Sequence, residues 1–263
     1  MTDEAGVELA NDNCHLAYGP VGDRAYDAAT DYWVGLAGGR GIFVHRSPSD
    51  RATPLREALR LVNDTDLMVV MRAAELVVYH ANHPYCPRCG SATEVVEWGR
   101  ARHCPACGAE HFPRIDPAII VAITDDNDRL LLGHHADWEP ARYSLFAGFV
   151  EAGESPEQTV VREVAEEVGL DVSDITYQGA QPWPGPRSLM LSYHAHGNGD
   201  PRPDGQEILA ARWFSRDQLT QSVARGDIVL PPASSVAYRL ITGWQNGGAA
   251  VPLSGPTLWR PTS

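Results

Sequence analysis

Three glutamates fall within about one turn of a predicted helix. Residues 155–169 read SPEQTVVREVAEEVG and contain Glu163, Glu166 and Glu167. Carboxylates three and four residues apart repel one another and destabilise a helix unless a positive group lies between them. Oxygen ligands in this number suit Mg²⁺ or Mn²⁺, which commonly bridge carboxylates and substrate phosphates. The alternative is a solvated acidic face, which explains most charge runs.

The helix that carries these glutamates has predicted boundaries. Ser155, Pro156 and Gln158 indicate a helix start, with a capping residue, a proline at the first helical position and a capping box. Gly169 is a typical helix stop. The predicted buried stripe consists of the apolar residues at helical spacing, which are Val161, Val164, Ala165 and Val168. The three glutamates are then expected on nearly the opposite face.

The spacing of residues around this helix resembles the Nudix box of the Nudix hydrolase family. Gly148 is followed after five residues by Glu154, and after seven more by REVAEEVGL at 162–170. The resemblance implies an α/β/α sandwich. It also implies metal-dependent hydrolysis of a nucleoside diphosphate that is linked to another group.

Four of the five cysteines form two CxxC pairs, Cys86 with Cys89 and Cys104 with Cys107. Two thiolate pairs on opposing turns place four sulfurs tetrahedrally, the arrangement that structural zinc prefers, and two short strands are expected between the pairs. Disulfides are the alternative, but they are rare in a cytoplasmic protein. Cys14 is left over and is interpreted as a small buried or idle thiol.

Composition limits the classes of function. The 263 residues suffice for one large domain or two small ones. A net charge of −13, from 21 Lys and Arg against 34 Asp and Glu, does not favour nonspecific binding to nucleic acid or an anionic membrane. The sequence has no run of 18 apolar residues and no secretory leader, so we expect a cytoplasmic protein without a membrane segment.

The chain divides into three predicted blocks, at residues 1–84, 85–112 and 113–263. The expected fold class is α+β, in which a small α/β domain and the zinc ribbon precede the Nudix domain. Predicted elements of the first block are an extended segment at 41–45 and helices at 54–62 and 71–80. Those of the third block are a hairpin of strands at 117–124 and 129–135, strands at 189–195 and 207–214, and a helix at 234–242.

A second segment narrows the resemblance. QPWPGPRS at 181–188 is similar to the QPWPFPxS signature of the NADH pyrophosphatase (NudC-like) subgroup, which also has a four-cysteine zinc ribbon and an FPR or YPR segment, here at 112–114. Members of that subgroup cut the diphosphate of NAD(H) to AMP and nicotinamide mononucleotide, and some remove an NAD cap from the 5′ end of RNA. The resemblance thus implies a dinucleotide substrate, Mg²⁺ or Mn²⁺ and a homodimer.

The resemblance also implies roles for individual residues. Glu163, Glu167 and Glu207 would bind the catalytic metals, Glu166 would complete the catalytic cluster, and a carboxylate or the metal would activate the attacking water. The implied substrate-binding residues are Phe112, Ala147, Phe149, Gln181, Pro182, Trp183, Pro184, Gly185, Ser188 and Ala237.

Three aromatic residues among these carry separate expectations. Phe149 and Phe112 would be the aromatic walls for nicotinamide, with Phe112 supplied by the other subunit; the alternative is that both are ordinary core residues. Trp183 lies between two prolines and is not expected to be a core residue of a regular strand, because proline interrupts ladder bonding.

Gly185 departs from the subgroup signature, which has Phe at this position. The loss of a large ring removes about 150–250 Å² of apolar contact. One hypothesis is that the pocket accepts an NAD derivative enlarged at the nicotinamide. The alternative is that a neighbouring side chain fills the gap and the substrate is unchanged.

Two other functions fit parts of the sequence. A nucleotide sensor with a nucleic-acid-binding ribbon would not need the intact glutamate set, and the net charge argues against extensive nucleic-acid binding. Four arginines nonetheless form a local basic cluster that could guide an RNA 5′ end or be solvated surface: Arg88, Arg100, Arg102 and Arg114. An enzyme that acts on ADP-ribose or a dinucleoside polyphosphate is the second alternative, and only the QPWP segment argues against it.

Overall fold

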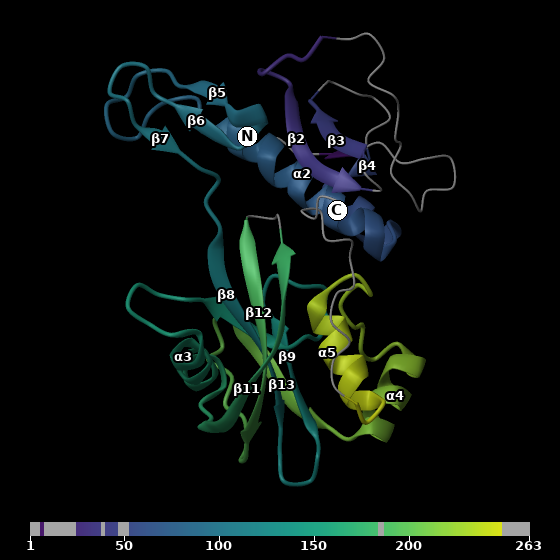
Figure 1. Cartoon of the computed structure of the whole chain (residues 1–263). Coiled ribbons are helices and arrows are strands. Elements are labelled where there is room, and N and C mark those ends of the chain that lie inside the picture. The colour runs from purple at the N-terminus through teal and green to yellow at the C-terminus, as the bar shows by residue number, and fades with distance from the viewer. Residues whose placement is uncertain (1–5, 8–24, 38–39, 47–52, 184–186, 249–263) are drawn as a thin grey trace. The chain divides into compact units, whose positions relative to one another are not determined.

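The computed structural model describes residues 6–7, 25–37, 40–46, 53–183 and 187–248 (Figure 1). These residues divide into two units. Described residues up to Ile115 belong to the first unit, and those from Asp116 onward, apart from Arg187, belong to the second. Neither Cys14 nor Gly185 is among the described residues.

A six-stranded mixed sheet forms the centre of the second unit. Its strands are β8 (Asp116–Thr124), β9 (Leu130–His135), β10 (Phe146–Phe149), β11 (Val172–Trp183), β12 (Ser188–Gly197) and β13 (Ile208–Phe214). Their order is β11-β12-β8-β9-β13, and β10 also pairs with β8. β12 runs parallel to β8, whereas the other pairs are antiparallel. The predicted hairpin is confirmed, because Thr124 pairs with Leu130.

Helices cover both faces of this sheet. In Figure 1, α3 (Pro156–Val168) lies on one face, and α4 (Arg216–Arg225) and α5 (Val236–Gln245) lie on the other. Because successive strand residues point to opposite faces, Val121 of β8 packs in the core layer under α3, and its neighbours Ile120 and Ala122 pack in the layer under α5. The expected α/β/α sandwich is confirmed.

The boundaries of α3 agree with the sequence. The Ser155 hydroxyl accepts a hydrogen bond from the Gln158 N–H, and the Gln158 side chain accepts one from the Ser155 N–H. Gly169 ends the helix in the left-handed conformation, with a φ of 64°. The predicted capping box and helix stop are therefore both confirmed.

The buried face of α3 differs from the prediction. Val164 and Val168 are buried as expected, but Val161 and Ala165 are exposed. Val160 takes their place, so the residues that meet the sheet are spaced four apart along the helix. The predicted stripe included Val161 and Ala165, which are apolar but do not pack on the sheet, and it was therefore rotated away from the face that is buried.

Other predicted elements of this unit are present, with two omissions. The strands predicted at 189–195 and 207–214 lie in β12 and β13, and the helix predicted at 234–242 overlaps α5. Both β11 and α4 were not predicted. Trp183 is the half-buried last residue of β11, which agrees with the expectation that it is not a core residue of a regular strand. β11 is an edge strand, where the missing N–H of Pro182 is tolerated.

The first unit contains short strands and two helices. They are β1 (Gly6–Val7), β2 (Asp31–Ala37), β3 (Arg40–His45), β4 (Thr53–Pro54), α1 (Leu55–Leu61), α2 (Asp64–Asn82), β5 (Glu94–Val96), the 3-10 turn η1 (Glu97–Gly99), β6 (Ala101–His103) and β7 (Glu110–His111). The helices and the extended segment predicted here overlap α1, α2 and β3. The two short strands expected in the ribbon are β5 and β6. The β2–β3 hairpin packs on α2 through Val34, Ile42 and Val69.

A buried polar network joins α2 to the ribbon. His80 lies 2.8 Å from the Gly99 carbonyl through Nε2, which must donate because a carbonyl can only accept. Its Nδ1 then accepts from Arg102, 3.1 Å away, and Arg102 also donates to the backbone and hydroxyl oxygens of Thr93. Burial lowers the pKa of His80 to about 4. The proposed basic cluster therefore loses Arg102, which is buried.

Across the described segments, no helix has the length and apolar character needed to cross a membrane.

Candidate active site and zinc site

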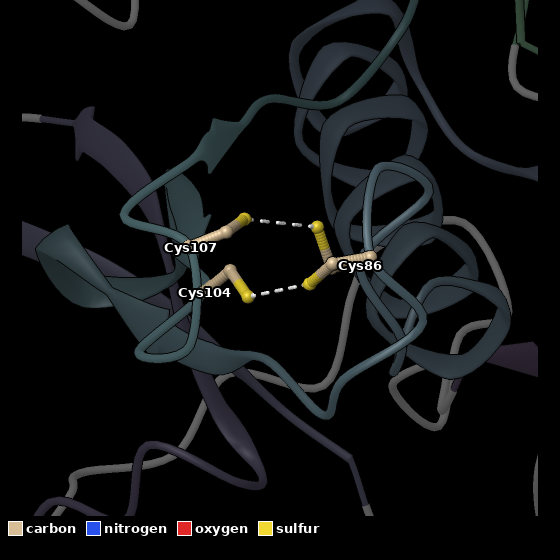
Figure 2. Close-up of side chains that lie close together, drawn as sticks. Cys86, Cys104 and Cys107 are labelled. Atoms are coloured by element: carbon tan, nitrogen blue, oxygen red, sulfur yellow. Dashed lines mark hydrogen bonds between the residues drawn. The ribbon is translucent and has the colours of Figure 1, made fainter.

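Four cysteine thiols converge in the ribbon. Figure 2 shows Cys86, Cys104 and Cys107 directed toward a common centre. The Cys86 and Cys107 sulfurs are 3.7 Å apart, the Cys89 and Cys104 sulfurs are 3.5 Å apart, and all four lie within 4.8 Å of one another. Tetrahedral zinc with Zn–S bonds of about 2.3 Å requires sulfurs about 3.8 Å apart. None of the four forms a disulfide, and their arrangement fits zinc.

Matching turns bring the two cysteine pairs together. The Gly90 N–H donates to the Cys86 carbonyl, and the Gly108 N–H donates to the Cys104 carbonyl, each at 2.8 Å. Gly90 and Gly108 have φ values of 75° and 71°, in the left-handed region that favours glycine. The Nε2 atom of His111 lies 3.2 Å from the Cys86 sulfur and supports the site from outside.

Loss of one zinc ligand is expected to empty the ribbon. Loss of an outer-shell partner already weakens metal binding by about 10–100-fold, so Cys104→Ser should lower zinc affinity by more than about 100-fold. The purified variant should hold less than one zinc per chain by metal analysis and melt at a lower temperature. Cys14→Ser is the matched control and should retain zinc; equal zinc content in both variants would contradict the assignment.

Two of the predicted catalytic glutamates lie against the sheet. Glu163 and Glu167 are one turn apart on α3, and Glu167 is only 5% exposed, whereas Glu166 is exposed. The alternative of a solvated acidic face thus holds only for Glu166. The structure brings the predicted metal ligands together, since the negative charges of Glu163 and Glu207 both act on Glu167.

Gly148 makes room for one of these carboxylates. It lies in β10, and a Cβ atom there would overlap the carboxylate of Glu163. A side chain at position 148 would therefore displace the Glu163 carboxylate from its present position. The first residue of the Nudix-box spacing thus has a direct steric role in placing Glu163.

The environment of Glu167 fits a bound cation. Burial, followed by the nearby charges of Glu163 and Glu207, raises the pKa of Glu167 to about 8. Burial also raises the pKa of Glu163. The Oε2 atom of Glu167 is buried and accepts no hydrogen bond from the described residues. A buried carboxylate oxygen without a donor is costly, and a divalent metal would relieve that cost.

Arg162 holds the acidic residues around this site. Its guanidinium donates to both carboxylate oxygens of Glu154, at 2.7 and 3.0 Å, and to Glu163 and Glu166 at 2.8 and 3.1 Å. It also donates to the carbonyl of Phe149. The Arg162 guanidinium, assisted by a Thr159 hydroxyl, lowers the pKa of Glu154 to about 2. Arg162 therefore fixes the loop after β10 to the helix that carries the glutamates.

Glu207 is positioned by a turn that was not predicted from the sequence. The Asp204 carboxylate accepts hydrogen bonds from the N–H groups of Gln206, Glu207 and Ile208. The Asp204 N–H donates to the Glu167 carbonyl at 3.0 Å, which ties this turn to the end of α3. The Asp-Gly pair at 204–205 is a turn signal that could have identified it.

Several predicted substrate-binding residues share the opposite face of the sheet. The strand register pairs Phe149 with Ala118, Ala118 with Met190, and Met190 with Gln181, which makes one row across four strands. Ala147, Trp183 and Ser188 point to the same face by strand alternation. Ala237 belongs to α5 and is buried in the core layer between that helix and this face. Neighbouring residues of β10 therefore face the two sides of the sheet: Gly148 faces Glu163, and Phe149 faces the side that carries Gln181.

Both polar atoms of the Gln181 side chain form hydrogen bonds within the protein. Its side-chain N–H donates to the Ser234 carbonyl at 2.8 Å, and its side-chain oxygen accepts from the Val236 N–H at 2.6 Å. Gln181 is fully buried. These contacts attach edge strand β11 to the start of α5, so the geometry favours a positioning role for Gln181.

The phenylalanines divide into exposed and core residues. Phe149 and Phe112 are 50% and 60% exposed, in the second and first units respectively, whereas Phe146 is buried beneath α3. The core alternative is therefore wrong for Phe149 and Phe112. Pro184 and Gly185, predicted to bind substrate, lie outside the described residues.

Comparisons with known proteins point to the same two sites. The NUDIX domain model matches residues 114–233, and the NADH pyrophosphatase zinc ribbon domain model matches residues 81–112. A solved NUDIX hydrolase from Nitrosomonas europaea superposes with a TM-score of 0.51 at 22% identity, covering 65% of this chain and 97% of that one. At that identity the likeness shows the fold alone.

Curated relatives carry the description "NAD-capped RNA hydrolase NudC". The protein from Mycobacterium bovis (strain BCG / Pasteur 1173P2) is 42% identical over 204 residues, which cover 73% of this chain and 65% of that protein. The chain thus spans 65% of the length of this relative. The protein from Pseudomonas aeruginosa (strain LESB58) is 39% identical over 204 residues, covering 76% of this chain and 70% of the relative.

Proposed function

Because the chain belongs to the Nudix hydrolase family, we propose that it is a metal-dependent pyrophosphohydrolase that cleaves the diphosphate of NAD(H). The products would be AMP and the nicotinamide mononucleotide. The observation that carries the proposal is the buried Glu167 carboxylate, which has an oxygen without a hydrogen-bond donor among the described residues and lies beside Glu163 and Glu207. The adjoining zinc ribbon supports the choice of NAD(H) within the family.

The glutamates and Arg162 would have different roles in hydrolysis. Glu163, Glu167 and Glu207 would hold Mg²⁺ or Mn²⁺, which supplies positive charge against the charge that builds on the diphosphate. A carboxylate of the cluster takes a proton from water as its oxygen attacks phosphorus, and the bridging P–O bond breaks. The released phosphate leaves with its bond electrons. Arg162 keeps Glu163 and Glu166 in place through its two hydrogen bonds.

The opposite face of the sheet would bind the dinucleotide. Phe149, exposed at the end of β10, provides an apolar wall one residue from Gly148 and the glutamates. Phe112 would supply the second wall from the other subunit of a homodimer. We also propose that the enzyme acts in the cytoplasm, where reduced thiols can hold zinc.

Phe149→Ala is expected to weaken substrate binding more than chemistry. Loss of a stacking ring costs roughly 1.5 kcal/mol beyond lost area, so KM for NADH should rise about tenfold while kcat changes little. Steady-state kinetics measure the split. Phe149→Tyr, which retains the ring, is the control and should keep the wild-type KM. A fall in kcat at unchanged KM in Phe149→Ala would contradict a role in binding.

A second candidate substrate is RNA that carries an NAD cap. The printed description of the Mycobacterium bovis relative favours it. Values of kcat/KM should be compared for NADH, NAD, an NAD derivative enlarged at nicotinamide, ADP-ribose and NAD-capped RNA. The proposal expects NAD(H) or the capped RNA to be preferred. Preference for the enlarged derivative would support the hypothesis on Gly185, and preference for ADP-ribose would contradict the NAD(H) assignment.

A further inference from the structure

Arg102 is a buried cation whose hydrogen bonds all end on uncharged groups. It is 7% exposed. Its guanidinium donates to the hydroxyl and the carbonyl of Thr93, at 2.6 and 2.9 Å, and to Nδ1 of His80, which is neutral because this nitrogen accepts. Among the residues that the structure describes, no carboxylate forms an ion pair with Arg102. A charge buried in this way is costly unless an opposite charge offsets it.

The ribbon strands place Arg102 beside the zinc ligands. Arg102 lies in β6, which leads directly into Cys104. It is the cross-strand partner of His111 in β7. Such partners share one face of a sheet, with Cβ atoms about 4.5–5.5 Å apart. The Nε2 atom of His111 lies 3.2 Å from the Cys86 sulfur, so Arg102 is the neighbour of a residue that contacts a zinc ligand.

A short ladder ties the guanidinium of Arg102 to the first cysteine pair. The Thr93 N–H donates to the Pro84 carbonyl at 2.9 Å, and the Cys86 N–H donates to the Ser91 carbonyl at 2.8 Å. One bridged pair of residues lies between these two hydrogen bonds. Thr93, which holds the guanidinium, therefore belongs to the same ladder as the backbone of a zinc ligand.

Other groups of the ribbon offset the charge of Arg102 only in part. The acids Glu94, Glu97 and Glu110 are exposed, and solvent and salt screen their charges. The last turn of α2 contains His80, and a helix C-terminus carries about half of a negative charge. Four thiolates around one Zn²⁺, in contrast, leave a double negative charge. Two of the four cysteines are buried, where a charge pair is screened little.

We propose that Arg102 is the counter-charge of the zinc site. Its positive charge stabilises the four-thiolate centre, and the bound centre in turn offsets the cost of burying the guanidinium. His80 of α2 accepts from the same guanidinium, so zinc binding is coupled to the packing of α2 on the ribbon. Arg102 is thus a positioning residue of the metal site, and the inference does not depend on the substrate.

Two substitutions separate the charge of Arg102 from its hydrogen bonds. Arg102→Lys keeps the charge but loses the planar fork, whereas Arg102→Gln keeps a donor and loses the charge. Zinc affinity of the full chain is measured by competition with a chromogenic chelator. Arg102→Gln should bind zinc about 10–100-fold more weakly than wild type, which is the usual effect of losing an outer-shell partner. Arg102→Lys should bind at least about fivefold more tightly than Arg102→Gln.

Arg100→Gln is the matched control for the loss of charge. Arg100 is exposed and lies two residues before Arg102, so this variant should bind zinc as wild type does. Arg102→Met fills the same space without a charge and takes the place of Arg102→Gln if the latter does not fold. Unchanged zinc affinity in the neutral variant overturns the inference. An equal loss in Arg102→Lys and the neutral variant also overturns it, because hydrogen bonding alone then explains the effect.

Thermal melts with zinc and after zinc removal test the coupling independently. A ligand stabilises the folded state according to its affinity, so zinc should raise the melting temperature of Arg102→Gln less than that of wild type. Arg102→Lys should lie between the two. A melting temperature that Arg102→Gln lowers equally with and without zinc would show that Arg102 supports the fold alone, and would overturn its assignment as the counter-charge.

Discussion

Glu167→Gln is expected to remove hydrolysis of NADH while leaving the fold intact. The substitution keeps the shape of the side chain but removes the negative charge that a metal ligand or proton acceptor needs. The loss should be about 10²–10⁴-fold in kcat, measured with saturating Mg²⁺. Gln206→Glu exchanges an amide and a carboxylate at an exposed position of the neighbouring turn and serves as the control.

The same substitution is expected to stabilise the protein without catalytic metal. The pKa of Glu167 in the folded chain, about 8, exceeds its ordinary value of 4.5. The folded state therefore binds a proton more tightly than the unfolded chain, and the free energy of unfolding falls as pH rises between these values. Gln does not ionise, so Glu167→Gln should be more stable than wild type at pH 8, by about 1–3 kcal/mol.

Thermal melts between pH 5 and pH 9 test this linkage, in buffer that lacks Mg²⁺ and Mn²⁺ but leaves the zinc in place. The melting temperature of wild type should fall as pH rises, and that of Glu167→Gln should fall less. Addition of Mg²⁺ should raise the melting temperature of wild type more than that of the variant, because a ligand stabilises the state that binds it. A variant that melts below wild type at pH 8 would show that Glu167 is stabilised by a partner instead of strained by burial.

Gly148→Ala is expected to inactivate the enzyme through steric displacement alone. The added Cβ atom occupies the space of the Glu163 carboxylate, which lies at the end of a flexible side chain and can swing away. The fold should therefore survive, with melting temperature close to wild type. A displacement of about 1 Å in a reacting group can cost about 10²-fold, so kcat should fall by at least that factor.

Gly248→Ala is the matched control for this substitution. A Cβ atom at Gly248 meets no described atom within 4 Å, and its φ lies outside the left-handed region. Its activity and melting temperature should equal those of wild type. Wild-type activity in Gly148→Ala, measured by the same NADH assay, would show that Glu163 does not need its present position.

The helix and its glutamates were predictable because local rules determine them. Ser155, Gln158 and Gly169 specify the ends of α3 through backbone hydrogen bonds and a left-handed turn, all within one segment. The face that α3 buries depends instead on the sheet beneath it. Periodicity alone could not choose between Val160 and Val161, and so it placed Glu167 nearly opposite the buried stripe, whereas packing buries it.

Contacts between distant segments account for the remaining differences. β11 was missed because it carries proline and glycine, which are tolerated at the sheet edge. Arg102 resembled a surface charge in sequence, yet it is buried against His80, 22 residues away. The role of Gln181 as a tie to α5 likewise depends on residues more than 50 positions along the chain. Residue type and spacing do not reveal such partners.

The identity of the products from NADH tests most directly whether the buried glutamates form a hydrolytic centre. Wild type and Glu167→Gln should be incubated side by side with NADH, with and without Mg²⁺ or Mn²⁺, and analysed by chromatography and mass spectrometry. We expect equal amounts of AMP and reduced nicotinamide mononucleotide from wild type with metal, and almost none from the variant or without metal. Equal product from wild type and Glu167→Gln would contradict the assignment of the buried glutamates as the hydrolytic centre.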